Sequence, residues 1–286
     1  MILLKKFILN ADDFGLSKAI NRAVLEGYSA GLLRSVSLVA NGEAFREAID
    51  NVLPECPEIG VGVHLNVTEG ISLCIDLTKL TNEKGQFSNN YFQLFLKSCN
   101  LKDKEFFEQL EREFRRQIET VMARCKVTHI DSHDHIHSIP CIFKIVCRLA
   151  KEYGIKQVRT HFEKPYIVPD LQKHLSFTYS LNILKTIVLG FFTIFNEAVV
   201  HKYELKTNDY IVGIIYDSMM EAITVSYGVM VVKHAPVVEA IVHPCRYEDG
   251  TINSHFDEFM LTKNKKLKNR IEDLGFEITN YAEKES

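Results

Sequence analysis

The sequence predicts an α/β fold in which seven or eight mostly parallel strands form a closed or nearly closed barrel covered by helices. Short apolar runs of strand length alternate with helical segments along the whole chain. This number of β-then-α units in 286 residues suits a (β/α) barrel. A doubly wound open sheet is the alternative. No G-x-G-x-x-G follows the first strand, which disfavours a dinucleotide-binding domain.

The first half of the chain shows this alternation clearly. Ser17 can cap a helix that ends near Gly31, and a short helix is expected over 43–52. Apolar residues at helical spacing, with charges between them, predict an amphipathic helix over 103–125. The strands expected between these helices cover residues 6–10, 36–40, 59–67 and 127–131.

The second half continues the alternation. Pro140 suits the first position of a helix that runs to Tyr153. A further helix is expected from about Ser218, and a charged one over 257–273. The strands expected here cover residues 157–160, 209–216, 239–242 and 276–279.

We expect one domain over residues 1–286, because no internal repeat and no linker rich in Pro, Gly or Ser divides the chain. Residues 68–100 lack a strong periodicity and contain the turn signal Asn82–Gly85, so we interpret them as a long functional loop. Together with residues 161–205, they are the insertions that we expect to set specificity.

The most apolar stretch, residues 183–200, is interrupted by a lysine, an asparagine and a glutamate. It therefore falls short of the about 18 unbroken apolar residues of a membrane span. We expect a helix that is buried or lines a groove, and its residues 183–195 could form a homodimer interface. The apolar run Met1–Leu9 is too short for the core of a signal peptide.

Composition narrows the compartment and the partners. Apolar residues make up 46% of the chain and charged residues 25%, which are ordinary values for a globular protein. The net charge is −3, so the chain lacks the basic excess of a nucleic-acid-binding protein. Seven cysteines without a C-x-x-C pair are typical of reduced thiols, and we expect a cytoplasmic protein.

Polar side chains collect where the predicted strands end. In a parallel barrel the carboxyl ends of all strands open onto one face, so these residues are expected to converge there. In chain order they are Asp12, Asp13, Asn41, His64, Asp131, His133, Arg159 and His243.

This set of side chains indicates a particular chemistry. Two imidazoles and a carboxylate suffice to hold a divalent ion and leave positions open for water and substrate. Such an ion lowers the pKa of bound water and polarises a carbonyl group. A second carboxylate could take the proton of the water, and a histidine could protonate the leaving group. Arg159 could keep the base carboxylate ionised. The pattern predicts a metal-assisted hydrolase of an amide or ester.

The run Ser132–His137 concentrates further polar residues beside the candidate ligand His133. Asp134, His135 and His137 belong to this run, and the spacing assigns them no role. The other histidines stand alone, and we interpret them as surface or core residues: His161, His174, His201, His234 and His255.

Four short segments match a known family: N-A-D-D-F-G at 10–15, V-H-L at 63–65, T-H-I-D-S-H-x-H-x-H at 128–137, and His-Pro at 243–244. On these motifs the chain resembles the YdjC-like carbohydrate deacetylases, which include bacterial chitooligosaccharide deacetylases and animal YdjC homologues. The resemblance extends from residue 7 to about 281. It implies a distorted (β/α) barrel that removes N-acetyl groups from acetylated sugars with the help of a divalent cation.

Carried over position by position, the resemblance implies that Asp13, His64 and His133 are the metal ligands. It implies that Asp12 accepts the proton of the attacking water. It also implies Mg²⁺ as the usual metal. Oxygen ligation favours Mg²⁺, whereas two imidazoles favour Zn²⁺.

Two further roles follow from analogy with polysaccharide deacetylases, namely His243 as general acid and Arg159 as the residue that orients Asp12. Two positions depart from the family pattern. Asp134 stands where many relatives carry His or Gln, and Cys245 stands where Gly usually follows His-Pro. Neither change removes an implied ligand, so we expect an active enzyme.

The predicted reaction is the hydrolysis of an acetamido sugar to an amino sugar and acetate. Phe14, Tyr91, Phe92 and Tyr166 are candidates for stacking on a sugar ring. The alternatives are a non-catalytic sugar-binding protein on the same fold, an iron-dependent oxygenase and another metal-dependent amidohydrolase. The β/α alternation disfavours the oxygenase. The Asp-Asp pair after the first strand, where an amidohydrolase typically has H-x-H, disfavours the last.

Overall fold

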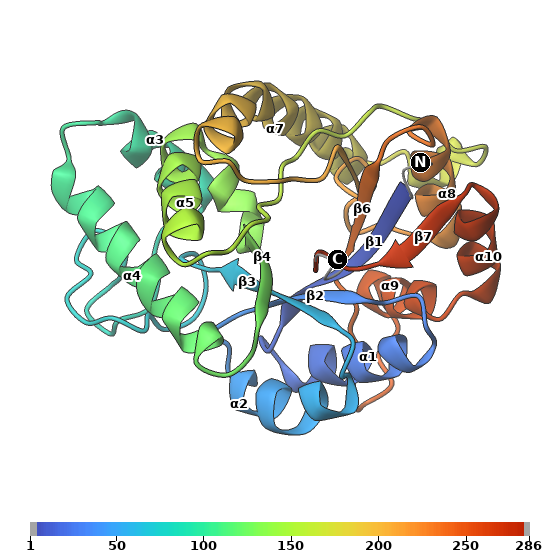
Figure 1. Ribbon diagram of the computed structural model, residues 1–286, viewed down its shortest axis with the longest axis horizontal. Coiled ribbons are helices and arrows are strands. Elements are labelled where there is room, and N and C mark those ends of the chain that lie inside the picture. The colour runs from blue at the N-terminus through green and yellow to red at the C-terminus, as the bar shows by residue number, and fades with distance from the viewer. Residues whose placement is uncertain (1–4, 283–286) are drawn as a thin grey trace.

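The computed structural model describes residues 5–282, and a parallel sheet lies at its centre (Figure 1). The strands are β1 (Lys5–Phe14), β2 (Ser35–Leu38), β3 (Gly60–Leu65), β4 (Val127–Ser132), β5 (Tyr210–Val212), β6 (Val237–Val242) and β7 (Phe276–Thr279). Their order is β4-β3-β2-β1-β6-β5, and β7 pairs with the first half of β1. All of these pairs are parallel. The predicted α/β class with a mostly parallel sheet is confirmed.

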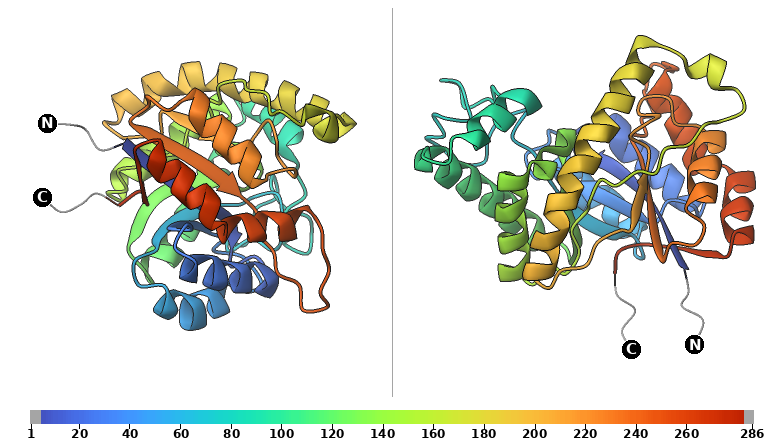
Figure 2. Two further views of the ribbon diagram at one scale, coloured as in Figure 1. Left: turned by 90° about the vertical axis from the view of Figure 1, so that its right-hand side faces the viewer. Right: turned by 90° about the horizontal axis from the view of Figure 1, so that it is seen from above.

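Helices surround the sheet, because each parallel connection must cross over from one end of the sheet to the other (Figures 1 and 2). Ser17 caps the first helix, as predicted, and Pro140 begins the fifth. The longer helices are α1 (Lys18–Ser29), α3 (Tyr91–Cys99), α4 (Lys104–Met122), α5 (Pro140–Glu152), α7 (Phe177–Lys202), α8 (Ala222–Val231), α9 (Ser254–Thr262) and α10 (Lys265–Asp273). Shorter turns are α2 (Phe45–Glu47), η1 (Ala48–Val52), η2 (Leu53–Glu55), η3 (His133–Ser138) and α6 (Leu171–His174).

The gap between β4 and β5 is bridged by irregular backbone. Residues 157 and 158 form single parallel bridges, to Lys206 on one side and to Ile130 of β4 on the other. The regular strand predicted over 157–160 is therefore wrong. The side-chain amide of Asn208 bonds the backbone N–H and C=O of Thr160 and so takes the place of a strand partner.

The strand predicted over 209–216 is shorter than expected, since β5 ends at Val212. The carboxylate of Glu163 accepts the backbone N–H groups of Gly213, Ile214 and Ile215, which a continuing strand would need for its ladder. Gly213 has φ +136°, a conformation that side-chain-bearing residues rarely adopt.

The charged segment predicted as one helix over 257–273 consists of two helices, α9 and α10. The chain turns at Lys263, and the side chain of Asn264 then accepts the N–H of Leu267 as a new N-cap. The single-helix prediction is wrong because an internal asparagine cap can interrupt a pattern of apolar and charged residues.

Residues 68–100 are more ordered than a loop. They contain α3, whose Asn90 forms a capping box with Gln93. The segment before α3 is held by a buried polar stripe on α4: Glu113 accepts the N–H groups of residues 73 and 74, and Gln109 accepts the N–H of residue 79. The segment is therefore ordered by hydrogen bonds from its backbone to side chains of α4. This order leaves no hydrophobic periodicity in the segment's own sequence.

Residues 161–205 contain α7, which runs across the outside of the molecule (Figure 2). The prediction of a buried or groove-lining helix is wrong for most of its surface, because only 28% of its most apolar window is buried. The helix begins at Phe177, before the stretch 183–200. By its length of 26 residues and a mean hydropathy of 1.7 over its most apolar 18 residues, it could cross a membrane, but core helices of soluble proteins pass the same test. Of the run Met1–Leu9, residues 1–4 lie outside the described range.

Candidate metal centre and active site

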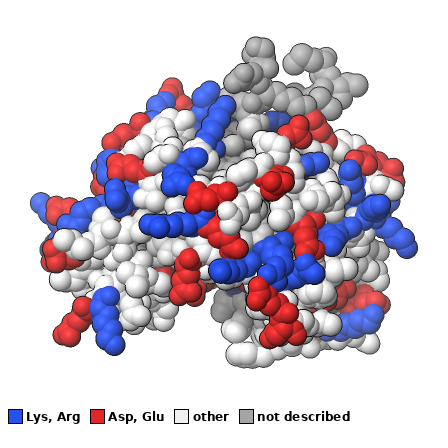
Figure 3. Space-filling model, turned by 90° about the horizontal axis from the view of Figure 1, so that it is seen from below, with Lys and Arg blue, Asp and Glu red and all other residues white. Residues whose placement is uncertain are grey.

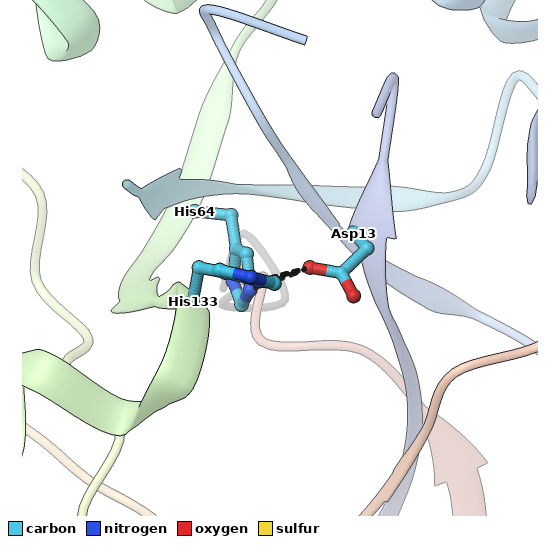
Figure 4. A group of neighbouring side chains, drawn as sticks. All are labelled: Asp13, His64 and His133. Carbon is cyan, nitrogen blue, oxygen red and sulfur yellow. Dashed lines mark hydrogen bonds and ion pairs between the residues drawn. The ribbon is translucent and has the colours of Figure 1, made fainter. Parts of the chain in front are cut away.

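The ends of β1, β3 and β4 bring three predicted ligands together (Figure 4). Asp13 lies near the end of β1, His64 near the end of β3, and His133 directly after β4. The Nδ1 atom of His133 lies 2.7 Å from Oδ1 of Asp13, and the Nε2 atom of His64 lies 3.3 Å from the same oxygen. One ligand atom from each residue lies within 4.8 Å of the others. A single divalent ion can reach all three.

The backbone around this group is strained. Asp13, Asp134 and His135 have φ values of +65°, +51° and +56°. This left-handed region costs of order 1–3 kcal/mol for a residue with a side chain, and it persists where the surroundings hold it in place. In this conformation the carboxylate of Asp13 contacts both imidazoles.

The charges of the group are strongly coupled. Burial would raise the pKa of Asp13, but the charges and hydrogen bonds of His133 and His64 outweigh burial and hold that pKa well below its ordinary value. Burial would lower the pKa of His64, yet the charges of Asp131 and Asp12 raise it to about 9. Against the same burial, Asp13 raises the pKa of His133. Both imidazoles must lose their protons when a metal binds.

A second carboxylate orients His64 from behind. Asp131, at the end of β4, accepts from Nδ1 of His64 at 2.8 Å, so that Nε2 of His64 points toward Asp13. The other oxygen of Asp131 accepts from Ser37 at 2.6 Å and lies 2.7 Å from Nη2 of Arg159. A carboxylate behind a ligand histidine fixes its tautomer and raises its basicity. Asp131 belongs to the predicted set of strand-end residues, but its place in the sequence indicated no role for it.

Asp12 lines the same pocket as this group and is bonded into a buried cluster beside it. Its two carboxylate oxygens accept from Nη1 and Nη2 of Arg159, each at 2.7 Å, and Asn10 donates to it at 2.7 Å. The guanidinium also contacts Glu239 at 2.7 Å, and Tyr281 donates to that carboxylate. Arg159 thus fixes Asp12 in one orientation. The contribution of Glu239 was missed, although an acidic residue within the apolar strand V-V-E-A-I-V is a signal.

His243 follows β6 on the other side of the pocket. Its backbone N–H donates to the buried carboxylate of Glu258, and its Nδ1 lies 3.6 Å from Glu258 Oε2. Burial would lower the pKa of His243, but the hydrogen bond and charge of Glu258 raise it to about 10. His255 accompanies His243, with its Nδ1 2.9 Å from the carbonyl oxygen of His243. The interpretation of His255 as an isolated surface or core residue is therefore wrong.

These groups line one pocket of about 180 Å³. Its wall also includes Lys185 of α7, whose Nζ lies 2.7 Å from Oδ2 of Asp217. No sequence motif pointed to this pair. The lining residues are Asp12, Asp13, His64, Ser132, His133, Asp134, His135, Lys185, Asp217, His243 and His255.

Some candidates lie elsewhere. None of the four aromatic residues proposed for stacking lines the pocket: Phe14 and Tyr166 are buried, Tyr91 bonds Ser138, and Phe92 is exposed on α3. Asn41 donates to the carbonyl oxygens of residues 69 and 71 and so holds the loop after β3.

Two histidines of the Ser132–His137 run have separate surroundings. His135 lines the pocket, whereas His137 is buried between Ser132 and the carbonyl oxygen of Arg159. His161 packs against both rings in the interior, as its interpretation as a core residue predicts.

Curated proteins resemble the chain over about half of its length. A carbohydrate deacetylase of Brevibacillus brevis is 39% identical over 151 residues, which are 52% of this chain and 57% of that protein. A carbohydrate deacetylase of Clostridium beijerinckii is 38% identical over 151 residues, covering 52% and 58%. Carbohydrate deacetylase 1 of Listeria innocua is 38% identical over 158 residues, covering 54% and 61%. The aligned part thus spans less than two thirds of each relative.

The fold and the family are matched over nearly the whole chain. A crystal structure from Enterococcus faecalis, described as a cellobiose-phosphate cleavage protein, superposes with a TM-score of 0.72. The superposition covers 97% of this chain and 98% of the other, at 20% sequence identity, and so concerns the fold alone. The family model described as YdjC-like protein matches residues 6–276. The chain therefore belongs to the YdjC-like family.

Proposed function

We propose that this protein is a metal-dependent carbohydrate deacetylase, which hydrolyses the N-acetyl group of an acetylated amino sugar and releases acetate. The observation that carries the proposal is the placement of Asp13, His64 and His133 around one point, with Asp12 and His243 in the wall of the same pocket. The carbohydrate deacetylases at 34–39% identity support the same substrate class.

Two imidazole nitrogens and a carboxylate oxygen fit a divalent ion that keeps positions open for water and substrate. When bound, such an ion lowers the pKa of water and polarises a carbonyl group. The family resemblance implies Mg²⁺, and this donor set also suits Zn²⁺. The identity of the metal is decided by adding single metals to the chelated protein.

The protein's own groups divide the proton transfers. Asp12 accepts a proton from the water whose oxygen adds to the acetyl carbon, and Arg159 holds Asp12 in place for this step. As the carbon–nitrogen bond breaks, the imidazolium of His243 donates a proton to the departing nitrogen. The products are acetate and a free amino sugar. The pKa of His243, about 10, keeps this acid protonated at neutral pH.

Replacing Asp12 with Asn tests the proposal. The variant keeps a side chain that can bond Arg159 but lacks the base, so we expect acetate release from chitobiose to fall by about 10²–10⁴-fold. Binding of the metal, measured by calorimetry, should change little. Asp273→Asn, the same chemical change at an exposed position of α10, should leave acetate release unchanged.

Three outcomes would contradict the proposal. Full activity of the Asp12→Asn variant would exclude Asp12 as the base. Full activity after treatment with a chelator, with no recovery on adding Mg²⁺ or Zn²⁺, would exclude a metal-dependent reaction. Calorimetric binding of chitobiose without release of acetate would instead assign a sugar-binding role.

A further inference from the structure

The helix α7 has an inverted distribution of polar and apolar side chains. Of the seven positions that it buries, four are polar: Asn182, Thr186, Thr193 and Asn196. Asn182 donates to the carbonyl oxygen of Asp217, and Asn196 donates to that of Ser138. This inner face therefore holds the helix to the pocket loops through hydrogen bonds.

The outer face of α7 is apolar throughout its middle. Between residues 181 and 195, every exposed side chain is a large aliphatic or aromatic one. A surface helix normally turns its apolar stripe inward and its polar residues outward. The exposed fractions range from 37% to 80% when the N-terminal Phe177 is included. The apolar strip consists of Phe177, Leu181, Ile183, Leu184, Ile187, Val188, Phe191, Ile194 and Phe195.

This apolar strip is larger than a monomer usually exposes. At 150–250 Å² for an aromatic side chain and somewhat less for an aliphatic one, its exposed area is roughly 800 Å². The largest apolar patch of a typical monomer is about 300–600 Å². The helix α3 adjoins the strip, since Phe95 stacks on Phe192 with 5.7 Å between the ring centroids. The opposite side of the molecule instead mixes acidic and basic side chains (Figure 3).

The charges of α7 favour a protein partner over a lipid surface. Helices that lie in a membrane interface carry Lys and Arg along their polar face. The only basic residues of α7 besides His201 are Lys185, which pairs with Asp217, and Lys202 in the last turn. The exposed area equals the about 800 Å² that each partner contributes to a stable interface of standard size, and homodimer interfaces are the more apolar ones.

We propose that the apolar strip is a homodimer interface, in which α7 packs antiparallel against α7 of a second copy. A two-fold axis pairs a surface with itself, and a straight strip along one helix meets this condition. Gly190 lies at the middle of the 26-residue helix. A Cβ atom there would lie 4.0 Å from the side chain of Phe162, so the chain itself leaves space beside the helix at this point. Lys185, on the same helix, would then be held in place at the pocket wall.

The first experiment measures the mass of the full chain by sedimentation equilibrium. We expect twice the 32.8 kDa of one chain. The double variant Ile187→Glu with Phe191→Glu should sediment as a monomer, with an unchanged circular dichroism spectrum. Ile75→Glu, at a position that is 82% exposed but lies outside the strip, should remain dimeric. A monomeric wild-type chain, or a double variant that stays dimeric, would overturn the proposal.

A second experiment locates the two-fold axis of the proposed dimer and uses cysteine substitutions, which add no charge to the strip. Val188→Cys places a thiol near the middle of α7, so mild oxidation should link two copies covalently. Thr178→Cys places the thiol near one end, where antiparallel helices keep the two copies apart, and should not cross-link. Wild-type chain, whose Cys99 is exposed, is the control for background oxidation. Cross-linking of residue 178 but not of residue 188 would refute the antiparallel arrangement.

The membrane alternative is tested with the same protein. The wild-type chain is mixed with vesicles of phosphatidylcholine and phosphatidylglycerol and separated by flotation. We expect it to remain with the soluble fraction as a dimer. If the wild-type chain floats with the vesicles and the double variant does not, the apolar strip binds a lipid surface. That result would overturn the homodimer.

Discussion

The two halves of the candidate site are built from similar residues and behave differently. The open half, Asp13, His64 and His133, meets the pocket, and two of its members keep 12% and 17% of their side chains exposed. The closed half consists of Asp12, Asp131, Arg159 and Glu239, with at most 2% of any side chain exposed. In the closed half Arg159 contacts all three carboxylates. In the open half, one ligand atom from each residue lies within 4.8 Å of the others, close enough for a single ion to bind all three.

The difference shows that one set of residues provides a rigid support and another set provides the metal ligands. A buried arginine that faces three carboxylates carries a large desolvation cost, and burial raises the pKa of Glu239 despite Arg159. The arginine fixes Asp12 and Asp131 in one orientation each, and the hydrogen bond from His64 to Asp131 then fixes the orientation of His64. The side chains of the closed half fix the positions of the ligand residues, so the ligand atoms of the open half remain available to bind a metal.

Replacing Arg159 with Met tests the closed half and should have the largest effect. The change leaves three carboxylates buried without their cation, so the free energy of unfolding should fall by about 3–5 kcal/mol. Urea denaturation followed by circular dichroism measures it. In the open half, His133→Ala should lower the same quantity by less than Arg159→Met does, because Asp13 keeps its contact with His64. Equal losses in the two variants would contradict the division into a supporting and a reactive half.

Replacing Asp131 with Asn tests the link between the halves. The variant keeps a hydrogen-bond acceptor for His64 but loses the charge that raises its basicity, so metal affinity should fall by about 10–100-fold. Calorimetric titration with Mg²⁺ or Zn²⁺ measures the change. Ser37→Ala, which removes only one hydrogen bond to Asp131, should have a smaller effect. Unchanged affinity in Asp131→Asn would show that the open half does not depend on this support.

Replacing Glu258 with Gln sharpens the comparison at His243. The pKa of His243 is raised to about 10, so the imidazolium acid is present at neutral pH and is lost as the pH rises through 10. Its contribution to stability is full below the ordinary pKa of about 6.5 and is lost over the same alkaline range. Without the charge of Glu258 the alkaline limb of kcat/KM should move down by about one to three pH units. If the alkaline limb of kcat/KM stays near pH 10 in the variant, Glu258 is not the cause of the raised pKa of His243.

The residues of the open half stand at strand ends, which predicted that they converge, and the family resemblance implied that they are the ligands. Asp13, His64 and His133 come from strands whose carboxyl ends had to share one face once the sheet was parallel. The roles of Glu239 and Glu258 were not predicted. A single acidic residue in an apolar strand or helix does not indicate which residue it will contact. The fit of Arg159 between three carboxylates depends on three strands and on the bridge at residues 157–158.

The helix α7 shows the same limit on a larger scale. Its apolar content was evident, and the stretch 183–200 was expected to be helical. Hydropathy along a sequence does not record which face meets the protein. The inner face is chosen by hydrogen bonds from Asn182 and Asn196 to loops that are distant in sequence.

The sequence by itself determined the α/β class, the capped start of α1 and the strand ends at which the candidate ligands stand, because these depend on spacing and on local propensity. Only the tertiary structure decided which carboxylates support His64 and Asp12, where β5 ends and which face of α7 is exposed. These features depend on contacts between residues far apart in the chain, which local patterns do not record.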